Sequence, residues 1–404
     1  MNRAVTTKVV SVTDQGHLGE VLERCSAAGW VGLDTEFWRE RTYRSRLCLA
    51  QLAVEDTIFL VDPMADLDMA GVAALIADAH VEIILHSGGQ DLELFHEHWG
   101  VVPERIFDVQ RAAGFAGYGA SLAYGNLVNV VLGVSLTKGE SYTDWCRRPL
   151  TEEQLTYAAD DVRYLAAIAD LLKERLAGLG RTEWVDEEMR VIEATAGRDV
   201  DADSAWRKVG GRGSLSRAQN TVLRELAWWR EQSAARRDVP RGWVIKDVTL
   251  TEIARRGPSS KKELMGVRGM NPKEVERSGD ELIAAVARGK AAPPIELEPT
   301  PSKNVQMRAR MLAGIADALL RARCEAGQVA SELVATRAQV EALLAAVISG
   351  GNELSGQRLQ QGWRKTLAGD AIVDLARGRI ALKVIGHPPY VQEVPLGEAT
   401  LEQR

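Results

Sequence analysis

The sequence predicts an α/β domain built on a mixed sheet and followed by all-helical domains. Apolar runs at residues 47–54 and 57–61 are separated only by Glu55-Asp56, which predicts an antiparallel hairpin. From residue 69 the pattern alternates between helix and strand, as is typical of parallel strands joined by helical crossovers. After about residue 206 the segments that we interpret as ordered are helices.

The elements of the first domain follow from local patterns. An amphipathic helix over residues 18–28, capped near Asp14, leads into a strand that begins Trp30-Val-Gly-Leu33. After the hairpin, the sequence predicts a helix at 69–77, a strand at 82–86, a helix at 91–99 and one long helix at 151–173. The sheet is therefore expected to be mixed and flanked by helices.

Three short acidic segments mark the candidate site. They are Asp34-Thr35-Glu36, Asp91 in His-Ser-Gly-Gly-Gln-Asp, and Tyr157-Ala-Ala-Asp-Asp161. Asp34 and Glu36 lie two residues apart on a strand and therefore on the same side, and Tyr157 and Asp161 lie four apart on one helical face. Each segment alone has a plain structural explanation, such as a solvated strand end or a helix N-terminal acid. Their order and spacing together predict a metal site.

Carboxylate oxygens are the ligands that hard cations such as Mg²⁺ prefer. Two such ions roughly 3.5–4 Å apart can stabilise both the attacking and the leaving oxygen of an in-line displacement at phosphorus. Four carboxylates can hold such a pair, and a phenol hydroxyl can orient the attacking water. The chemistry indicated is hydrolysis of a phosphodiester.

These segments resemble the three exonuclease motifs of the ribonuclease D family, in the DEDD-superfamily variant with Tyr four residues before the last Asp. The matches are Leu33-Asp-Thr-Glu-Phe37, Leu85-His-Ser-Gly-Gly-Gln-Asp-Leu92 and Tyr157-Ala-Ala-Asp-Asp-Val-Arg-Tyr-Leu165. The stretch from Leu136 to Leu150 also resembles the segment that precedes the third motif in that family.

The resemblance implies a ribonuclease H-like fold and a 3′-to-5′ exoribonuclease that releases 5′-monophosphates. It implies that two divalent ions, Mg²⁺ or Mn²⁺, are bound by Asp34, Glu36, Asp91 and Asp161, and that Tyr157 positions the attacking water. Precursors of tRNA and other structured RNA 3′ ends are the expected substrates. We interpret His86 as a hydrogen-bonded residue at a strand end and leave it out of the catalytic set.

The segment after the first domain is basic. Residues 207–290 contain 19 Lys and Arg against 10 Asp and Glu, whereas the whole chain has a net charge of −6. A basic domain of this kind could bind the phosphate backbone of a nucleic acid. Its basic residues could equally lie on a helical surface that only contacts solvent. Its pattern of an apolar helix at 220–233, a basic-Pro step and an Asp-x-x-Leu sequence resembles an HRDC domain. We predict that Trp228, Trp229 and Trp243 belong to its core.

The resemblance divides the chain into four parts. We predict an exonuclease domain at 1–203, an HRDC domain at 204–290, a Pro-rich linker at 291–304 and a diverged HRDC-like helical domain at 305–404. In the last part, helical patterns are expected at about 305–322, 329–335, 339–348 and 361–369, and Gly350-Gly351 should break the helices. This unit could grip RNA or pack against the exonuclease domain.

The distribution of apolar residues and cysteines predicts the cellular compartment of the protein. The first residues lack a signal-peptide-like apolar stretch, and no run approaches the roughly 20 apolar residues that span a bilayer, so we expect a cytoplasmic protein without a membrane partner. The cysteines are widely spaced and form no Cys-x-x-Cys pair, so neither a zinc site nor a disulfide framework is predicted.

Two alternatives stay open from the sequence. The same metal site could hydrolyse DNA, because only contacts to the 2′-hydroxyl distinguish the two backbones. A non-catalytic RNA-binding protein could also use this fold, and loss of a carboxylate would signal it. The four carboxylates and the tyrosine that the family's chemistry requires are all present in this sequence. The exact substrate, the preferred metal, the oligomeric state and any protein partners do not follow from the residues.

Overall fold

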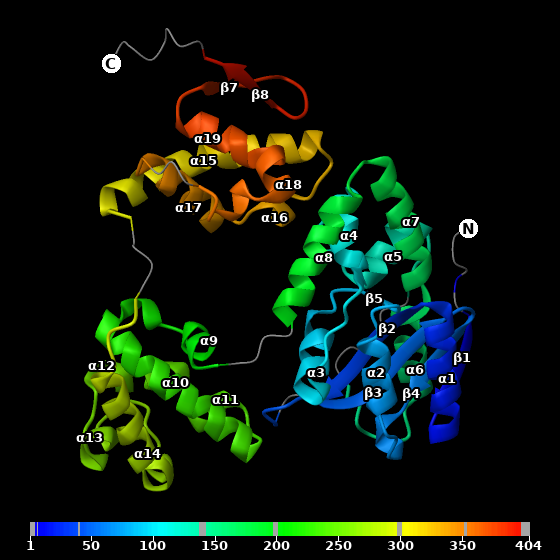
Figure 1. Cartoon of the computed structure of the whole chain (residues 1–404), viewed down its shortest axis with the longest axis horizontal. Coiled ribbons are helices and arrows are strands. Elements are labelled where there is room, and N and C mark those ends of the chain that lie inside the picture. The colour runs from blue at the N-terminus through cyan, green and yellow to red at the C-terminus, as the bar shows by residue number, and fades with distance from the viewer. Residues whose placement is uncertain are drawn as a thin grey trace.

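The structure is a computed structural model that describes residues 5, 7–38, 41–136, 143–196, 201–296, 301–350 and 354–396. Within these residues the chain forms a first unit around a six-stranded sheet, a second unit of helices, and a third unit of helices with a two-stranded sheet (Figure 1). The predicted fold class, a mixed sheet flanked by helices and followed by helical domains, is confirmed.

The six-stranded sheet has the order β1-β4-β3-β2-β5-β6. Strands β2 (Trp30–Trp38), β3 (Arg46–Val54) and β4 (Thr57–Val61) are antiparallel neighbours, which confirms the predicted hairpin. Strand β5 (Glu82–Leu85) runs parallel to β2. The parallel edge strands β1 (Lys8–Val12) and β6 (Ile106–Asp108) were not predicted. Segments of five and three residues are too short for an alternating pattern of apolar and polar residues to be recognised.

Helices cover the sheet, and β4 is consequently buried along its whole length. Helix α1 (Gln15–Ala28) begins after Asp14, whose carboxylate accepts a hydrogen bond from the His17 backbone N–H at 2.9 Å, as predicted. Helices α2 (Ala70–Ile76) and α3 (Gly89–Trp99) also match their predictions. Further elements of this unit are η1 (Pro63–Ala65), α4 (Val109–Phe115), α5 (Tyr124–Leu132) and α8 (Thr182–Ala196).

The prediction of one continuous helix at 151–173 is wrong. Two helices occupy this region, α6 (Glu152–Arg163) and α7 (Leu165–Gly178), and they are separated at Tyr164. The backbone N–H of Tyr164 donates to the Val162 carbonyl oxygen and also, at 3.2 Å, to the hydroxyl of Tyr124, a residue 40 positions away in sequence. The local pattern contains no sign of that contact.

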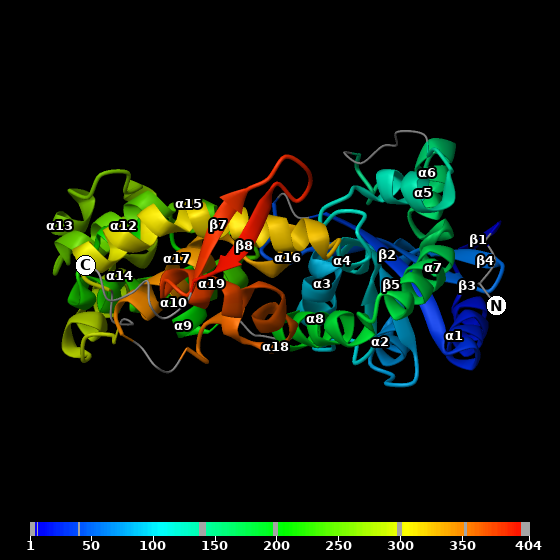
Figure 2. The same cartoon turned by 90° about the horizontal axis from the view of Figure 1, so that it is seen from above.

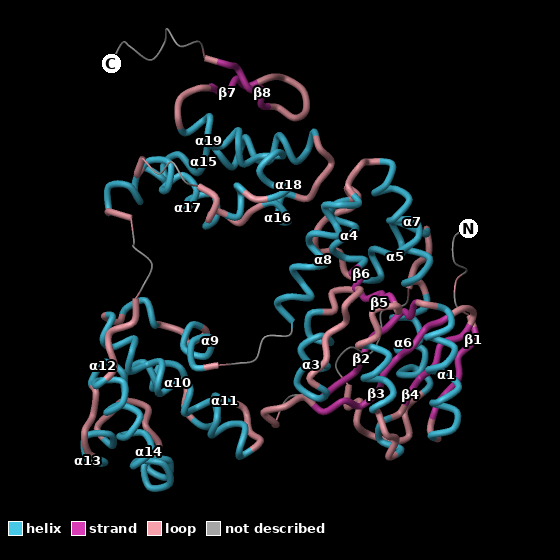
Figure 3. Tube along the Cα trace, in the orientation of Figure 1, coloured by secondary structure: helices cyan, strands magenta, loops and turns pink. Residues whose placement is uncertain are grey.

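The second unit has its own hydrophobic core and consists of helices and loops (Figure 3). Trp229 is buried in this core as predicted, but the core prediction is wrong for Trp228, which is half-buried and is not part of this core. The core prediction is wrong for Trp243, whose side chain is 64 % exposed on a short helix. The elements are α9 (Ala202–Arg207), η2 (Arg212–Ser214), α10 (Arg217–Arg237), α11 (Arg241–Val244), α12 (Asp247–Arg256), α13 (Lys261–Met265) and α14 (Pro272–Ala291).

The third unit shares a hydrophobic core with the first, and α16 and α18 lie beside α4 and α8 (Figures 1 and 2). The Trp363 ring stacks on Trp184, with ring centroids 5.2 Å apart, and Arg364 forms a buried ion pair with Glu188 at 2.7 Å. Its elements are α15 (Lys303–Ala326), α16 (Ser331–Val334), α17 (Arg337–Ile348), η3 (Arg358–Gln360), α18 (Gly362–Arg364), η4 (Lys365–Gly369), α19 (Asp370–Ala376), β7 (Ile380–Val384) and β8 (Val391–Pro395). The β7–β8 hairpin was not predicted.

One cysteine prediction is corrected. Cys48 and Cys146 form a disulfide with Cα atoms 4.9 Å apart, although 98 residues separate them in sequence. Cys48 is the extra residue of a β-bulge, because Glu36 pairs with Leu49 and Phe37 with Leu47. The bond therefore ties the segment around Cys146 to the strand next to the candidate site. Spacing along the chain cannot reveal a pair that only the fold brings together.

Some predictions fall outside the described residues. These are residues 137–142 of the segment before the third motif, residues 297–300 of the Pro-rich stretch, and Gly351. The described helices include none with the length and apolar character needed to cross a membrane.

Candidate active site

The candidate site lies where β2 runs past the end of β5. Strand β5 pairs with Trp30, Val31 and Gly32 of β2, so Asp34 and Glu36 lie beyond this pairing. A cavity of about 930 Å³ opens there. It is lined by Asp34, Glu36 and Asp91 together with residues of the β5–α3 turn, of β6 and α4, and of the segment 143–145.

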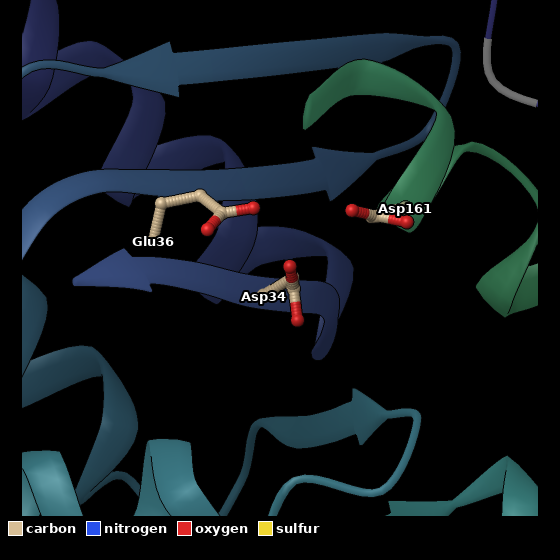
Figure 4. Close-up of side chains that lie close together, drawn as sticks. All are labelled: Asp34, Glu36 and Asp161. Atoms are coloured by element: carbon tan, nitrogen blue, oxygen red, sulfur yellow. The ribbon is translucent and has the colours of Figure 1, made fainter. Parts of the chain in front are cut away.

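Three predicted acids converge at this point. One carboxylate oxygen from each of Asp34, Glu36 and Asp161 lies within 4.8 Å of the other two. Asp34 and Glu36 extend from β2 and Asp161 extends toward them from α6 (Figure 4). Helix α6 is fixed at its start by a capping box, in which Thr151 and Gln154 exchange side-chain and backbone hydrogen bonds.

Asp91 lines the same cavity but lies outside this three-carboxylate cluster. It is buried in the first turn of α3, and the Thr35 hydroxyl donates a hydrogen bond to its carboxylate at 2.5 Å. The turn before α3 is held by Asp108, whose carboxylate accepts from the backbone N–H groups of Ser87 and Gly88 at 3.2 and 3.3 Å. The position of Asp91 is therefore set from two sides.

The two adjacent acids of the third motif have different partners. The Tyr157 hydroxyl donates a hydrogen bond to Asp161, and its ring lies 5.9 Å from that of Trp145. Asp160 instead pairs with Arg163 at 2.7 Å. Tyr157 and Asp161 also line a second cavity, of about 1070 Å³.

His86 makes a structural contact. Its Nε2 lies 2.9 Å from the Leu122 carbonyl oxygen, as expected for a hydrogen-bonded residue at a strand end. Burial lowers the pKa of its imidazole.

Burial raises the pKa of all four carboxyl groups. The pKa of Glu36 rises to about 8, through burial and then the charges of Asp161 and Asp91. Burial raises the pKa of Asp161 to about 7 and that of Asp91 to about 6. The pKa of Asp34 lies well above its ordinary value, first through burial and then through Asp91. The protein alone therefore opposes full ionisation at neutral pH.

This donor set fits divalent cations. A cation would offset the mutual repulsion and the desolvation of these carboxylates and so favour their ionised form. Their oxygens are of the type that Mg²⁺ and Mn²⁺ prefer. The Asp34, Glu36 and Asp161 oxygens lie within 4.8 Å of one another, which is close enough for them to bind one ion.

Sequence reasoning missed supporting residues. Thr35 orients Asp91, Asp108 holds the turn, and Tyr124 is half-buried, with a pKa raised by the burial of its hydroxyl and by the nearby Asp161 and Asp34. Thr35 could have been suspected, because it stands between two candidate ligands. Tyr124 and Asp108 could not, since only the tertiary structure brings them to the site.

The chain resembles known nucleases along most of its length. Residues 9–177 match the 3′-5′ exonuclease family and residues 219–286 match the HRDC domain family. Ribonuclease D of Gluconacetobacter diazotrophicus is 37% identical over 380 residues, which cover 93% of this chain and 95% of the relative. Ribonuclease D of Cronobacter turicensis is 35% identical over 368 residues, covering 90% of this chain and 99% of that protein.

Comparison with solved structures also finds a nuclease. The crystal structure of Escherichia coli RNase D, described as an exoribonuclease involved in structured RNA processing, aligns with a TM-score of 0.77 and 29% identity. The alignment covers 92% of this chain and 99% of that one. A protein from Bifidobacterium adolescentis, at 20% identity and a TM-score of 0.64, shares the fold. The chain thus belongs to the ribonuclease D family of 3′-5′ exonucleases.

Proposed function

We propose that this exonuclease shortens structured RNAs, tRNA precursors among them, from the 3′ end and releases 5′-monophosphates. The observation that carries the proposal is the convergence of the Asp34, Glu36 and Asp161 oxygens beside a cavity that Asp91 also lines. The description of the Escherichia coli relative as an exoribonuclease for structured RNA supports the substrate class.

In this proposal each site residue has a stated task. Asp34, Glu36, Asp91 and Asp161 hold two divalent ions, Mg²⁺ or Mn²⁺, which when bound stabilise charge on the attacking and leaving oxygens. Tyr157 orients the attacking water toward phosphorus through its hydroxyl, which already lies in hydrogen-bond contact with Asp161. Thr35 keeps the Asp91 carboxylate facing the cavity. Attack at phosphorus with the 3′ oxygen leaving yields the 5′-monophosphate.

The test compares the purified protein with its Asp34→Asn and Asp161→Asn variants on 3′-extended tRNA and on single-stranded DNA of matched length, with and without Mn²⁺. We expect metal-dependent stepwise shortening of the RNA, reduced by orders of magnitude in both variants while RNA binding persists. Asp160→Asn is the matched control, because Asp160 neighbours Asp161 but pairs with Arg163. RNA binding without release of mononucleotides would refute the proposal, and faster cleavage of DNA would reassign the substrate.

The proposed substrates place the enzyme in the cytoplasm, where most disulfides are reduced. Alkylating the thiols of acid-quenched cells would show which state the Cys48–Cys146 pair has there. Fractionation of the same cells checks the location itself.

A further inference from the structure

A second hollow joins the active-site cavity. A cleft of about 770 Å³ lies between the exonuclease domain and the HRDC domain. Gly89 and Ile192 line both this cleft and the active-site cavity, so the two hollows meet at these residues. A polymer whose 3′ end lies at the carboxylates could continue into the cleft.

The HRDC domain is fixed against the cleft by a defined contact. The Tyr43 hydroxyl donates to Glu231 at 2.9 Å, and the Tyr43 backbone N–H donates to Asp238 at 3.0 Å. Arg241 pairs with the same Glu231 at 2.7 Å and lies over the Tyr43 ring. Tyr43 belongs to the β2–β3 connection, so this contact ties the HRDC domain to the strand that carries Asp34 and Glu36.

Trp228 supplies an aromatic side chain to this cleft. It lies on α10, where the next residue, Trp229, is buried and donates its indole N–H to Glu281 at 2.6 Å. Trp228 instead is half-buried and lines the cleft together with Tyr43 and Lys208. The two neighbouring indoles therefore have different roles, one in the core and one in the cleft.

The charges of the cleft favour stacking over phosphate binding. Its lining contains the basic residues Arg44 and Lys208 but also the acidic residues Glu93, Glu97 and Asp201. A wall of mixed charge gives little net attraction for a phosphate backbone, whereas an indole face accepts any base.

We propose that this cleft binds the single-stranded RNA immediately upstream of the 3′-terminal nucleotide, with Trp228 stacking on one of its bases. The inference rests on the proposed function, because it takes RNA as the polymer whose 3′ end enters the active site. Dinucleotides reach only the carboxylates, whereas longer strands also fill the cleft. The protein should therefore prefer longer single strands, and Trp228 should be the origin of part of that preference.

The test compares kcat/KM on an RNA dinucleotide and on a single-stranded octanucleotide, in Mn²⁺, for the full-length protein and its Trp228 variants. Trp228→Ala should lower kcat/KM on the octanucleotide about tenfold or more, mainly through KM, and leave the dinucleotide unchanged. Trp228→Phe should restore most of the loss. Trp243→Ala is the matched control, since this Trp is on the same domain, is 64 % exposed and is not among the side chains that line the cleft.

Equal losses on both substrates, or no loss on either, would overturn the proposal. If the parental protein cleaved neither substrate, the proposed function would fail. RNA binding by the cleft would then be tested without cleavage. Fluorescence anisotropy of a labelled octanucleotide in EDTA then decides, because weaker binding by Trp228→Ala than by Trp243→Ala supports the cleft and equal binding refutes it.

Discussion

The Tyr157 hydroxyl can donate a hydrogen bond at the site while its phenol stays neutral. Burial and the neighbouring Asp161 raise the pKa of its phenol, so it stays protonated and can donate a hydrogen bond. Tyr157→Phe should lower kcat about tenfold or more, as expected for one hydrogen bond that helps to orient the reacting water, and less than Asp34→Asn does. Single-turnover cleavage of 3′-extended RNA measures this. A variant that cleaves at the parental rate would show that the assigned role is wrong.

The raised pKa values of the buried acids give a pH dependence whose sign is fixed. The pKa of Glu36 is about 8 in the folded protein against an ordinary 4.5, so its contribution to stability is complete below the lower value and is lost as pH rises through the upper one. The metal-free protein should therefore have a lower Tm at about pH 8.5 than at about pH 6.

Mn²⁺ should raise the Tm more at the higher pH, because the ion binds the ionised carboxylates. Calorimetry in EDTA and in Mn²⁺ checks both expectations. A metal-induced rise that becomes smaller toward high pH would contradict the assignment of these acids as ligands. The Glu36→Gln variant, which removes one titrating ligand, should show a smaller difference between the two pH values.

Among the structural elements, the turn from β5 into α3 is the one on which the position of Asp91 depends. A Cβ on Gly88 would lie 2.7 Å from Cδ1 of Leu85, whereas a Cβ on Gly89 would meet nothing within 4 Å. Gly88→Ala should therefore destabilise the protein by about 1–3 kcal/mol and reduce activity, because the new Cβ would also lie 3.0 Å from the Leu85 Cβ, so moving the end of the Leu85 side chain is not enough.

Gly89→Ala is the matched control. It should be neutral or stabilise by about 0.4–1 kcal/mol, since an alanine in the first turn of a helix restricts the unfolded chain more than a glycine does. Urea unfolding of both variants tests the pair, and cleavage rates are compared only between Gly88→Ala and the parental protein, because Gly89 itself lines the active-site cavity. Equal destabilisation by the two substitutions would show that the close approach at Gly88 does not matter.

Across the full chain, the third unit is joined to the exonuclease domain by a buried ion pair. Arg364 and Arg358 both approach Glu188, but the Arg364 side chain is 3 % exposed and the Arg358 side chain is 45 % exposed. Arg364→Met should cost about 3–5 kcal/mol, because Glu188 keeps only the more distant and exposed Arg358 and the buried Leu333 and Val334 carbonyls lose their hydrogen bonds from Arg364. Arg358→Met should cost about 0–1 kcal/mol. Denaturant unfolding of the two variants checks the contrast, and similar costs would contradict it.

The basic HRDC domain predicts a salt effect on RNA binding. Lys262 and Arg268 are exposed on this domain, and Lys383 is exposed on β7 of the third unit. The double variant Lys262→Glu with Arg268→Glu should weaken RNA binding and reduce the slope of log K against log salt by about one for each phosphate that the domain no longer neutralises. Lys383→Glu should change neither. A slope that both variants leave unchanged would count against phosphate binding by this domain.

The sequence by itself determined the chemistry and the main elements. Asp34 and Glu36 on one strand, and Tyr157 and Asp161 on one helical face, are set by the periods of the backbone, so their grouping could be predicted locally. The antiparallel hairpin of β3 and β4 and the capped helix α1 follow from similarly short patterns.

Only the tertiary structure decided the features that depend on residues distant in sequence. At the helix break the Tyr164 N–H contacts the hydroxyl of Tyr124, 40 residues away, and the disulfide joins Cys48 and Cys146 across 98 residues. The cleft beside Trp228 lies between two domains that the Tyr43–Glu231 hydrogen bond joins. Local pattern records which residues share a face of one element, whereas contacts between elements depend on how the whole chain packs.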